Sequence, residues 1–188
     1  MLKHVQEYGK YIAIAGFRNV QIGDVATFLE KARKAANENV EVQFFDAGLV
    51  ASWQHLYFAA LNALKAFENG ENISKSLAVE ALLYASAQRQ IKKATEILGI
   101  KENTDTIAVL LIGENVRQLE KALDNVSRVV CGKRDDNVLE LTQDKIERIR
   151  RVFEVEAAEI EAVANGKTLE EALVELVIER VTLLATER

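Results

Sequence analysis

The stretch ALLYASAQRQIKKATEILGI, residues 81–100, consists almost entirely of helix-forming residues and has no proline or glycine before Gly99. A single helix is therefore the first interpretation to test. At about 100° per residue, with Ile91 near the centre of the apolar face, Leu82 falls in the same row as Arg89 and Lys93. One unbroken helix would place a leucine on its most charged face, so the sequence predicts a break.

A break near Ser86 removes this conflict. Residues 79–85, VEALLYA, then form a short continuous apolar run, which is typical of a strand buried on both faces. Ser86 becomes the N-cap of a helix over 87–98, and Gly99 ends that helix at the C′ position. The sequence thus predicts a strand followed directly by a helix.

The break also changes the meaning of the basic residues. Arg89, Lys92 and Lys93 would lie in the first two turns of the helix, where the backbone dipole is positive and N–H groups are unpaired. Each cation is unfavourable there by up to about 1 kcal/mol, which a docked anion such as phosphate would offset. A solvated basic face paired with acids elsewhere is the alternative. Gln88 and Gln90 flank Arg89, and such a trio can contact phosphate, sugar or base edges.

Changes in hydrophobic period divide the rest of the chain into strands and helices. Short apolar or alternating runs predict strands at 10–17, 40–45, 106–112 and 137–142. A period near 3.6 predicts helices at 22–37, 49–67, 114–126, 143–152, 155–164 and from 168 onward. Asp46 is expected to cap the helix at 49–67, which is apolar on all sides and should be covered. Thr168 and Glu171 have the spacing of a capping box.

Strands alternating with helices predict an α/β fold. We expect a single domain over residues 1–188, with a small mixed central sheet of about 4–5 strands flanked by helices. The core should span about 10–142, and a helical C-terminal segment about 143–188. A chain of 188 residues is long enough to bury such a core.

The composition argues against several classes of function. No two of the nine glycines are closer than seven residues, which rules out the spacing of a dinucleotide fingerprint or a P-loop. Two histidines and one cysteine make a His/Cys zinc site or an internal disulfide untenable. We expect no catalytic residues, no metal and no cofactor. A small enzyme using carboxylate or His55 chemistry is the alternative, although His55 and Asn62 fit better as hydrogen-bonded core groups.

Charge and hydropathy limit the kinds of partner that the protein can bind. No apolar run is long enough to span a bilayer, and the first ten residues lack the apolar core of a signal peptide. We therefore expect a cytoplasmic protein without a membrane partner. The net charge is −5, so any contact with nucleic acid must come from a local basic patch.

The last helix carries an apolar surface that is wider than expected for a helix packed on a single core. Leu173, Val174, Val177, Ile178 and Val181 run round one side, while other leucines run round the opposite side. The apolar stripe of a helix packed on one core is somewhat over about 100° wide, and this one is wider. Either two internal surfaces bury it, or Val174 and Ile178 meet another protein.

The central stretch resembles the signature of a known family. Ala85-Ser86-Ala87-Gln88-Arg89-Gln90-Ile91, continuing to Gly99 and followed by TIAVLLIG at 106–113, is similar to the small KEOPS subunit that binds the PRPK-type kinase. The helix before it, ASWQHLYFAALNALKA at 51–66, and the segments at 138–153 and 178–185 resemble the same family. The likeness covers most of the chain from about residue 10 and is strongest at 74–113.

The resemblance implies a non-catalytic subunit that binds and stimulates the kinase and recruits tRNA by its 3′ CCA tail. The complex makes threonylcarbamoyladenosine (t6A) in tRNAs that read codons starting with A. The motif supplies Gln88, Arg89 and Gln90 as RNA contacts, and helix geometry adds Lys92 and Lys93. The full set of expected RNA-binding residues is Lys65, Lys75, Gln88, Arg89, Gln90, Lys92 and Lys93.

Two further assignments concern the RNA and the kinase. Ile73 or Tyr84 could offer an apolar face to a base, although Tyr84 fits the core better. The C-terminal helix is expected to bind the kinase through Val174, Ile178, Val181 and Leu184. Trp53 is either a packing residue or an interface anchor. A kinase-binding adaptor that does not bind RNA is the alternative function.

Overall fold

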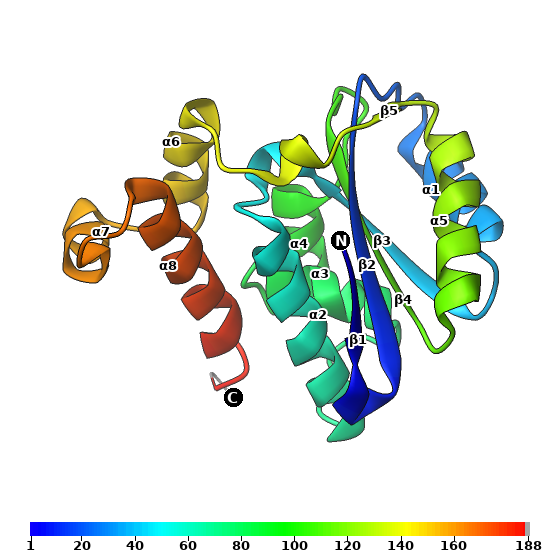
Figure 1. Cartoon of the computed structure of the whole chain (residues 1–188), viewed down its shortest axis with the longest axis horizontal. Coiled ribbons are helices and arrows are strands. Elements are labelled where there is room, and N and C mark those ends of the chain that lie inside the picture. The colour runs from blue at the N-terminus through cyan, green and yellow to red at the C-terminus, as the bar shows by residue number, and fades with distance from the viewer. Residues whose placement is uncertain (187–188) are drawn as a thin grey trace.

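The computed structural model describes residues 1–186, within which five strands form one sheet (Figure 1). The strand order is β1-β2-β4-β3, and β5 pairs with the far end of β2. Every pairing among these strands is antiparallel. The strands are β1 Leu2–Val5, β2 Lys10–Arg18, β3 Val40–Asp46, β4 Ile107–Gly113 and β5 Lys133–Arg134.

Helices cover both faces of this sheet. The α-helices are α1 Val25–Ala36, α2 Trp53–Glu68, α3 Leu77–Ala85, α4 Ile91–Leu98, α5 Val116–Val130, α6 Gln143–Val152, α7 Ala157–Ala164 and α8 Leu169–Leu183. Short 3-10 helices lie at η1 Gln6–Tyr8, η2 Ala47–Leu49 and η3 Asp136–Leu139. None of the helices formed by residues 1–186 is both long and apolar enough to cross a membrane.

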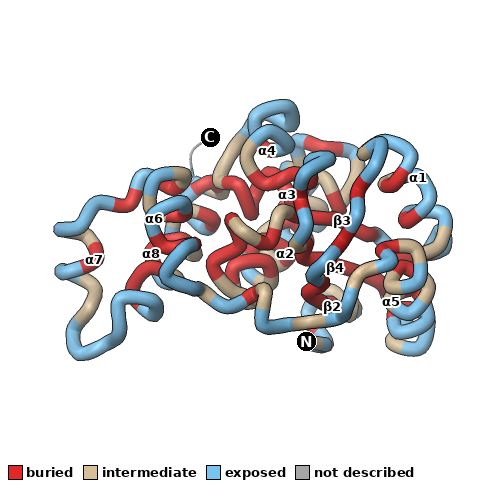
Figure 2. Tube along the Cα trace, turned by 90° about the horizontal axis from the view of Figure 1, so that it is seen from above, coloured by how far each residue is buried: buried red, intermediate tan, exposed pale blue. Residues whose placement is uncertain are grey.

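The helices form layers on the two sides of the sheet (Figure 1). Helices α1 and α5 cover one face, and α2 and α3 cover the other. Helices α6, α7 and α8 form an outer layer beyond α2, so α2 is buried between the sheet and α8. Figure 2 shows the buried residues running through α2, α3 and the strands. This burial explains why α2 is apolar on all sides, as the sequence predicted.

The predicted α/β class is confirmed, as are the strands at 10–17, 40–45 and 106–112 and most of the helices. The capping box is also confirmed, since Thr168 accepts from the Glu171 N–H (3.2 Å) and Glu171 accepts from the Thr168 N–H (2.9 Å). Strand direction differs from the prediction because the sheet is antiparallel and not mixed. Hydrophobic period carries no information on direction.

The prediction of a strand at 79–85 is wrong, because these residues belong to helix α3. Ser76 caps α3 by accepting from the Val79 N–H (3.4 Å). The helix is apolar on most sides because α2, the sheet and α8 surround it. A fully buried helix and a fully buried strand both read as a continuous apolar run, and period cannot separate them.

The break near Ser86 is real, but it joins two helices. Ser86 is the C-cap of α3 and not the N-cap of the next helix, which begins at Ile91 and not at residue 87. The Gln88 N–H donates to the Leu83 carbonyl (3.0 Å) and the Ala87 N–H to the Tyr84 carbonyl (2.9 Å), which is the Schellman pattern. Ala87 occupies the left-handed position, with φ +50°.

Three smaller predictions also differ from the structure. The segment 137–142 is not a strand, because η3 and an extended link occupy it. Asp46 caps η2 through the Gly48 N–H (2.9 Å), whereas Ser52 caps α2. Strand β1 was missed because only its last residue, Val5, is buried, so its sequence carries no apolar pattern.

Replacing Ala87 by glycine is expected to raise the free energy of unfolding by about 0.5 to 1 kcal/mol. A residue with a side chain is destabilised by about 1–2 kcal/mol in the left-handed region, and glycine avoids this strain. Part of the stabilisation is lost because glycine has more conformational entropy in the unfolded chain. Urea unfolding measures the change. Ala81→Gly, inside α3, is the control and should destabilise by about 1 kcal/mol or more. A loss of stability in Ala87→Gly would contradict the assignment of this turn.

Candidate functional site

The α3–α4 turn presents the residues of the A-S-x-Q-R-Q-I motif. After the Schellman turn the chain extends through Gln90, which is the N-cap of α4 and makes no side-chain cap. Lys92 and Lys93 lie in the first turn of α4 and are exposed, and Arg89 is exposed one residue before the cap. The sequence therefore placed Lys92 and Lys93 correctly at a helix start, although that helix begins later than expected.

A cavity of about 360 Å³, here called the turn cavity, lies beside this turn. Three segments far apart in the sequence line it: the α3–α4 turn, the end of α6 and the end of α8. The lining residues are Ser86, Ala87, Gln88, Lys93, Val152, Phe153, Glu154, Arg180, Leu183 and Leu184. The structure thus brings Gln88 and Lys93 together and adds Arg180, which the sequence analysis missed.

Arg89 lies at a second, smaller cavity with Ile73 and Glu80. The buried Glu80 carboxylate accepts hydrogen bonds from the backbone N–H of Ile73 (3.0 Å) and Ser74 (2.7 Å). Glu80 therefore holds the loop on which Ile73 is 46% exposed. Tyr84 is buried, in agreement with its expected place in the core. Ile73 and Arg89 thus line the same cavity.

The other two predicted RNA contacts lie elsewhere. Lys75 lines a separate groove of mixed charge, together with Lys10, Glu41 and Glu114 among others. Lys65 is exposed in the last turn of α2. The turn cavity contains neither of them, so their part in RNA binding stays a prediction.

His55 lies in the core directly behind the turn. Its Nδ1 accepts from the Ala51 N–H (3.2 Å), and its Nε2–H donates to the Ala85 carbonyl (2.7 Å). The ring packs edge-on against Phe153 at 5.4 Å between centroids. Burial, aided by the charge of Lys145, lowers the pKa of His55 to about 4. The expected core role of His55 is confirmed, and both ring nitrogens are occupied, which leaves neither for a substrate.

Asn62 differs from His55 in its surroundings. It is half-buried, and its side-chain amide donates to the Phe58 carbonyl one turn earlier in α2 (2.9 Å). The amide is therefore hydrogen-bonded, as expected, but within its own helix and outside the core.

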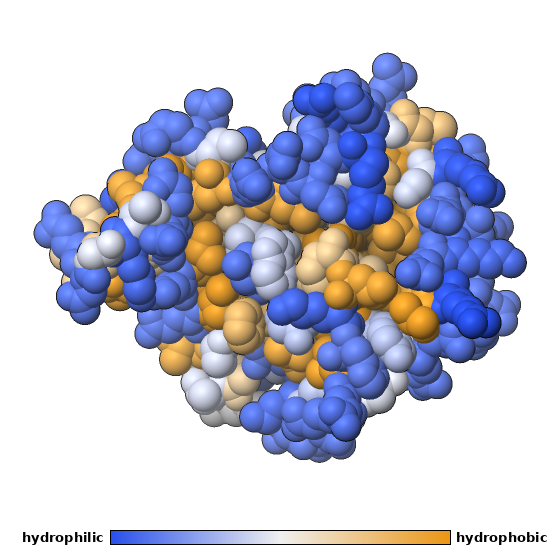
Figure 3. Space-filling view, viewed as in Figure 1, coloured by the Kyte–Doolittle hydropathy of each residue, from blue (hydrophilic) through white to orange (hydrophobic). Residues whose placement is uncertain are grey.

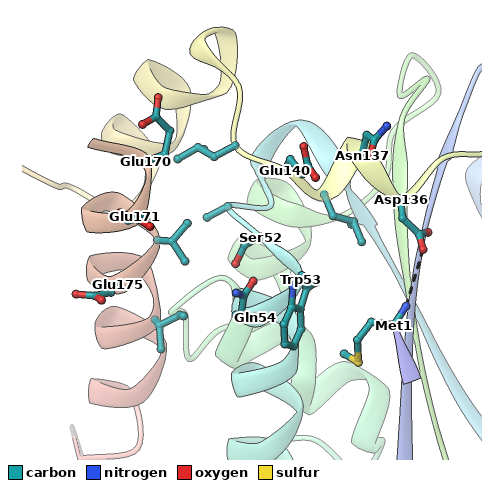
Figure 4. Close-up of a pocket in the computed structure, with 15 residues that line it drawn as sticks. Met1, Ser52, Trp53, Gln54, Asp136, Asn137, Glu140, Glu170, Glu171 and Glu175 are labelled. Atoms are coloured by element: carbon teal, nitrogen blue, oxygen red, sulfur yellow. Dashed lines mark ion pairs between the residues drawn. The ribbon is translucent and has the colours of Figure 1, made fainter. Parts of the chain in front are cut away.

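A larger hollow of about 590 Å³, here called the α8 groove, lies between α8, the start of α2 and η3 (Figure 4). Its apolar lining includes Trp53, Leu139, Leu141, Val174 and Ile178. Figure 3 shows hydrophobic surface gathered between α8 and the sheet on this face. Carboxylates surround it: Glu170, Glu171 and Glu175 on the α8 side, and Asp136 and Glu140 across from them.

The α8 helix contributes to both hollows. Val174 and Ile178 are half-buried and line the α8 groove. Val181 is fully buried in the core, and Leu184 is 7% exposed and lines the turn cavity. Of the four residues expected to bind the kinase, only Val174 and Ile178 therefore reach the groove surface.

Two lysines support the walls of the α8 groove. Lys145 is buried below η3, and its ammonium donates to the carbonyls of Val138 (3.0 Å) and Glu140 (2.9 Å). Burial lowers the pKa of Lys145 to about 8. Lys3 lies over the rings of Trp53 (4.7 Å) and Tyr57 (5.1 Å). Trp53 thus packs against its neighbours and also faces the groove.

A comparison with known families decides the identity. The model of the family described as kinase binding protein CGI-121 matches residues 17–185. The chain belongs to this family. The resemblance seen at residues 74–113 is thereby confirmed, and kinase binding is the property that names the family.

Members of the CGI-121 family from archaea and fungi are similar to this chain. The regulatory protein Cgi121 of Methanocaldococcus jannaschii is 33% identical over 119 residues, which are 63% of this chain and 74% of the relative. The KEOPS complex subunit Cgi121 of Pyrococcus abyssi is 26% identical over 120 residues, 64% of each chain. The EKC/KEOPS complex subunit CGI121 of Coccidioides immitis is 24% identical over 147 residues, 76% of this chain and 69% of the relative.

Proposed function

We propose that this chain is a non-catalytic, cytoplasmic KEOPS subunit that binds and stimulates a PRPK-type kinase and recruits tRNA by its 3′ CCA tail for t6A modification. The observation that carries the proposal is the division of surfaces along α8. Its middle lines an apolar groove, and its end lines a cavity with the basic start of α4. In this proposal the two partners therefore occupy different surfaces.

The kinase occupies the α8 groove in this proposal. The family description supports a kinase partner, and the groove offers an apolar floor with a rim of carboxylates. An amphipathic segment that lays apolar side chains on Val174 and Ile178 would bury this floor. Glu175 is ion-paired with Lys167, and Asp136 with Arg134. The acidic character of the rim therefore rests mainly on Glu140, Glu170 and Glu171, and a kinase segment facing them should carry lysine or arginine beside its apolar anchors.

The tRNA tail occupies the α3–α4 turn. A single-stranded tail is bound by cations that contact phosphates and by flat or apolar surfaces that contact bases. Lys92 and Lys93 supply charge at a helix start whose N–H groups favour anions. Arg89 and the exposed Ile73 both line the adjacent cavity. The chain as a whole is acidic, so binding must concentrate on this local patch.

Replacing Arg89 or Lys93 by glutamate is expected to weaken binding of an unmodified tRNA transcript by at least about tenfold. Each substitution removes a cation and adds a charge that repels phosphate. Filter binding or fluorescence anisotropy over a series of salt concentrations measures the effect. The matched control is Lys121→Glu, an exposed residue of α5 on the other side of the sheet, which should change affinity by less than about twofold.

The same assay with a transcript lacking CCA distinguishes the alternatives. We expect truncation to cost at least as much as either substitution. Equal binding of both transcripts would reject recognition of the tail. Kinase binding without any tRNA binding would favour the adaptor that lacks an RNA site.

A further inference from the structure

The turn cavity contains a cation that the family motif does not include. Arg180, in the last turn of α8, lines the cavity together with Gln88 and Lys93. Arg180 lies 92 residues after Gln88 and 87 residues after Lys93 in the sequence, on a helix that the motif does not include. Tertiary packing alone brings the two basic groups to one hollow.

The guanidinium of Arg180 is held by one carboxylate. Its Nη2 donates to Oε1 of Glu159 at 2.5 Å, and the arginine side chain is 26% exposed. The other oxygen of Glu159 accepts from the Glu156 N–H (2.8 Å) and closes the capping box of α7. Glu159 is therefore fixed at the start of α7 and holds Arg180 from one side.

An arginine has five N–H donors in a planar fork, and the ion pair with Glu159 is made by Nη2. A phosphate entering the cavity could accept from the remaining donors in the geometry that arginine favours. Glu159 also opposes such binding, since its negative charge partly neutralises Arg180 and repels phosphate. The ion pair thus weakens the cavity as an anion site.

We propose that Arg180 is a phosphate-binding residue of the turn cavity, acting with Lys93 on the RNA tail, and that Glu159 limits the strength of this contact. The proposal rests on the proposed function, because it assigns a further contact within the same RNA site. It leaves kinase binding untouched, since Arg180 does not line the α8 groove.

The test measures binding of the unmodified tRNA transcript ending in CCA to the full chain. Arg180→Gln is expected to weaken binding about fivefold and to reduce the slope of log affinity against log salt by about 1. Arg180→Lys should keep most of the affinity because it keeps the charge. Kinase affinity should stay within about twofold in both variants.

Glu159 gives the opposite result in the same assay. Glu159→Gln is expected to strengthen binding about threefold, and this gain should vanish when Arg180→Gln is also present, because the two residues act through one contact. Glu161→Gln removes the same charge from an exposed position of α7 and is the matched control, with an expected change below about twofold.

The outcomes separate this inference from the proposed function. If Lys93→Glu weakens binding but Arg180→Gln does not, the inference is overturned and the RNA site stands. If Glu159→Gln and Glu161→Gln strengthen binding equally, the effect is general charge repulsion and the role of Glu159 is overturned. If the wild type does not bind the transcript, both the RNA site and this assignment are rejected.

Discussion

Replacing Ile178 by arginine is expected to weaken kinase binding by at least about a hundredfold. Ile178 lies on the floor of the α8 groove beside Val174, where a docked segment would exclude water. A guanidinium there removes apolar contact area at the centre of the interface, and its positive charge repels the basic segment expected on the kinase. Central anchors of this kind can carry more than about 2 kcal/mol each.

Isothermal titration of the purified kinase subunit measures this loss. Thr182→Arg introduces the same side chain at an exposed position of α8 that lines neither hollow, and it should bind the kinase within about twofold of the wild type. Binding of the tRNA transcript should be unchanged in Ile178→Arg. Full kinase affinity in this variant would show that the kinase binds elsewhere.

The charge of the groove adds a second readout to the same experiment. Because Glu170, Glu171, Glu175, Asp136 and Glu140 surround the apolar floor, kinase affinity should fall as salt rises if the partner segment is basic. Affinity that is independent of salt would leave the apolar floor as the binding surface but reject a basic partner segment.

The second large effect is expected for His55, whose replacement should change both the free energy of unfolding and its dependence on pH. His55→Phe fills the space of the ring but leaves the Ala51 N–H and the Ala85 carbonyl without their partner. Each of the two unsatisfied buried groups costs about 1–3 kcal/mol, so we expect a loss of roughly 2 to 6 kcal/mol in the free energy of unfolding at pH 7.5. Urea unfolding measures it.

The wild type should also lose stability as the pH falls from about 6.5 to about 4. The pKa of His55 is lowered from 6.5 to about 4 by burial, so between these values the unfolded chain binds a proton that the folded protein does not. Stability from the neutral ring is complete above about 6.5 and declines below it, by about 3 kcal/mol in all.

The difference between variants isolates this effect. His55→Phe should lack the decline between pH 6.5 and 4, whereas His4→Ala, at an exposed position of β1, should keep it. The same decline in His55→Phe and in the wild type would assign the acid sensitivity to other groups. Carboxylates whose pKa is lowered, such as Asp136, contribute at lower pH.

Most elements of the fold could be predicted from the sequence because they are amphipathic or short and apolar. Helix α5 shows its period clearly because one face is buried and the other is exposed, and strand β4 is recognised as a short apolar run that ends at Gly113. Helix α3 did not, because burial on most sides removes the polar face that reveals a helical period. Strand β1 could not be predicted for the opposite reason: it is an exposed edge strand, and such a strand needs no apolar pattern.

In the candidate site, too, some residues could be predicted from the local sequence and others could not. The position of Gln88, Lys92 and Lys93 beside a helix start could be predicted because the motif and the helix start lie within a few consecutive residues. Arg180 and Phe153 were missed because they reach the turn cavity only through the packing of α6 and α8. Leu184 was assigned to the kinase surface by helix geometry, yet the structure turns it to the turn cavity.

The sequence by itself determined that residues 81–100 contain a break, that basic side chains follow it, and that α8 is too apolar for a helix packed on one core. These are local properties, because cap preferences and helical period act over a few neighbouring residues. Tertiary structure decided which side of α8 meets the groove and which meets the turn, and it joined Arg180 to Lys93. Such choices depend on the burial of surfaces from distant segments, and no local pattern encodes them.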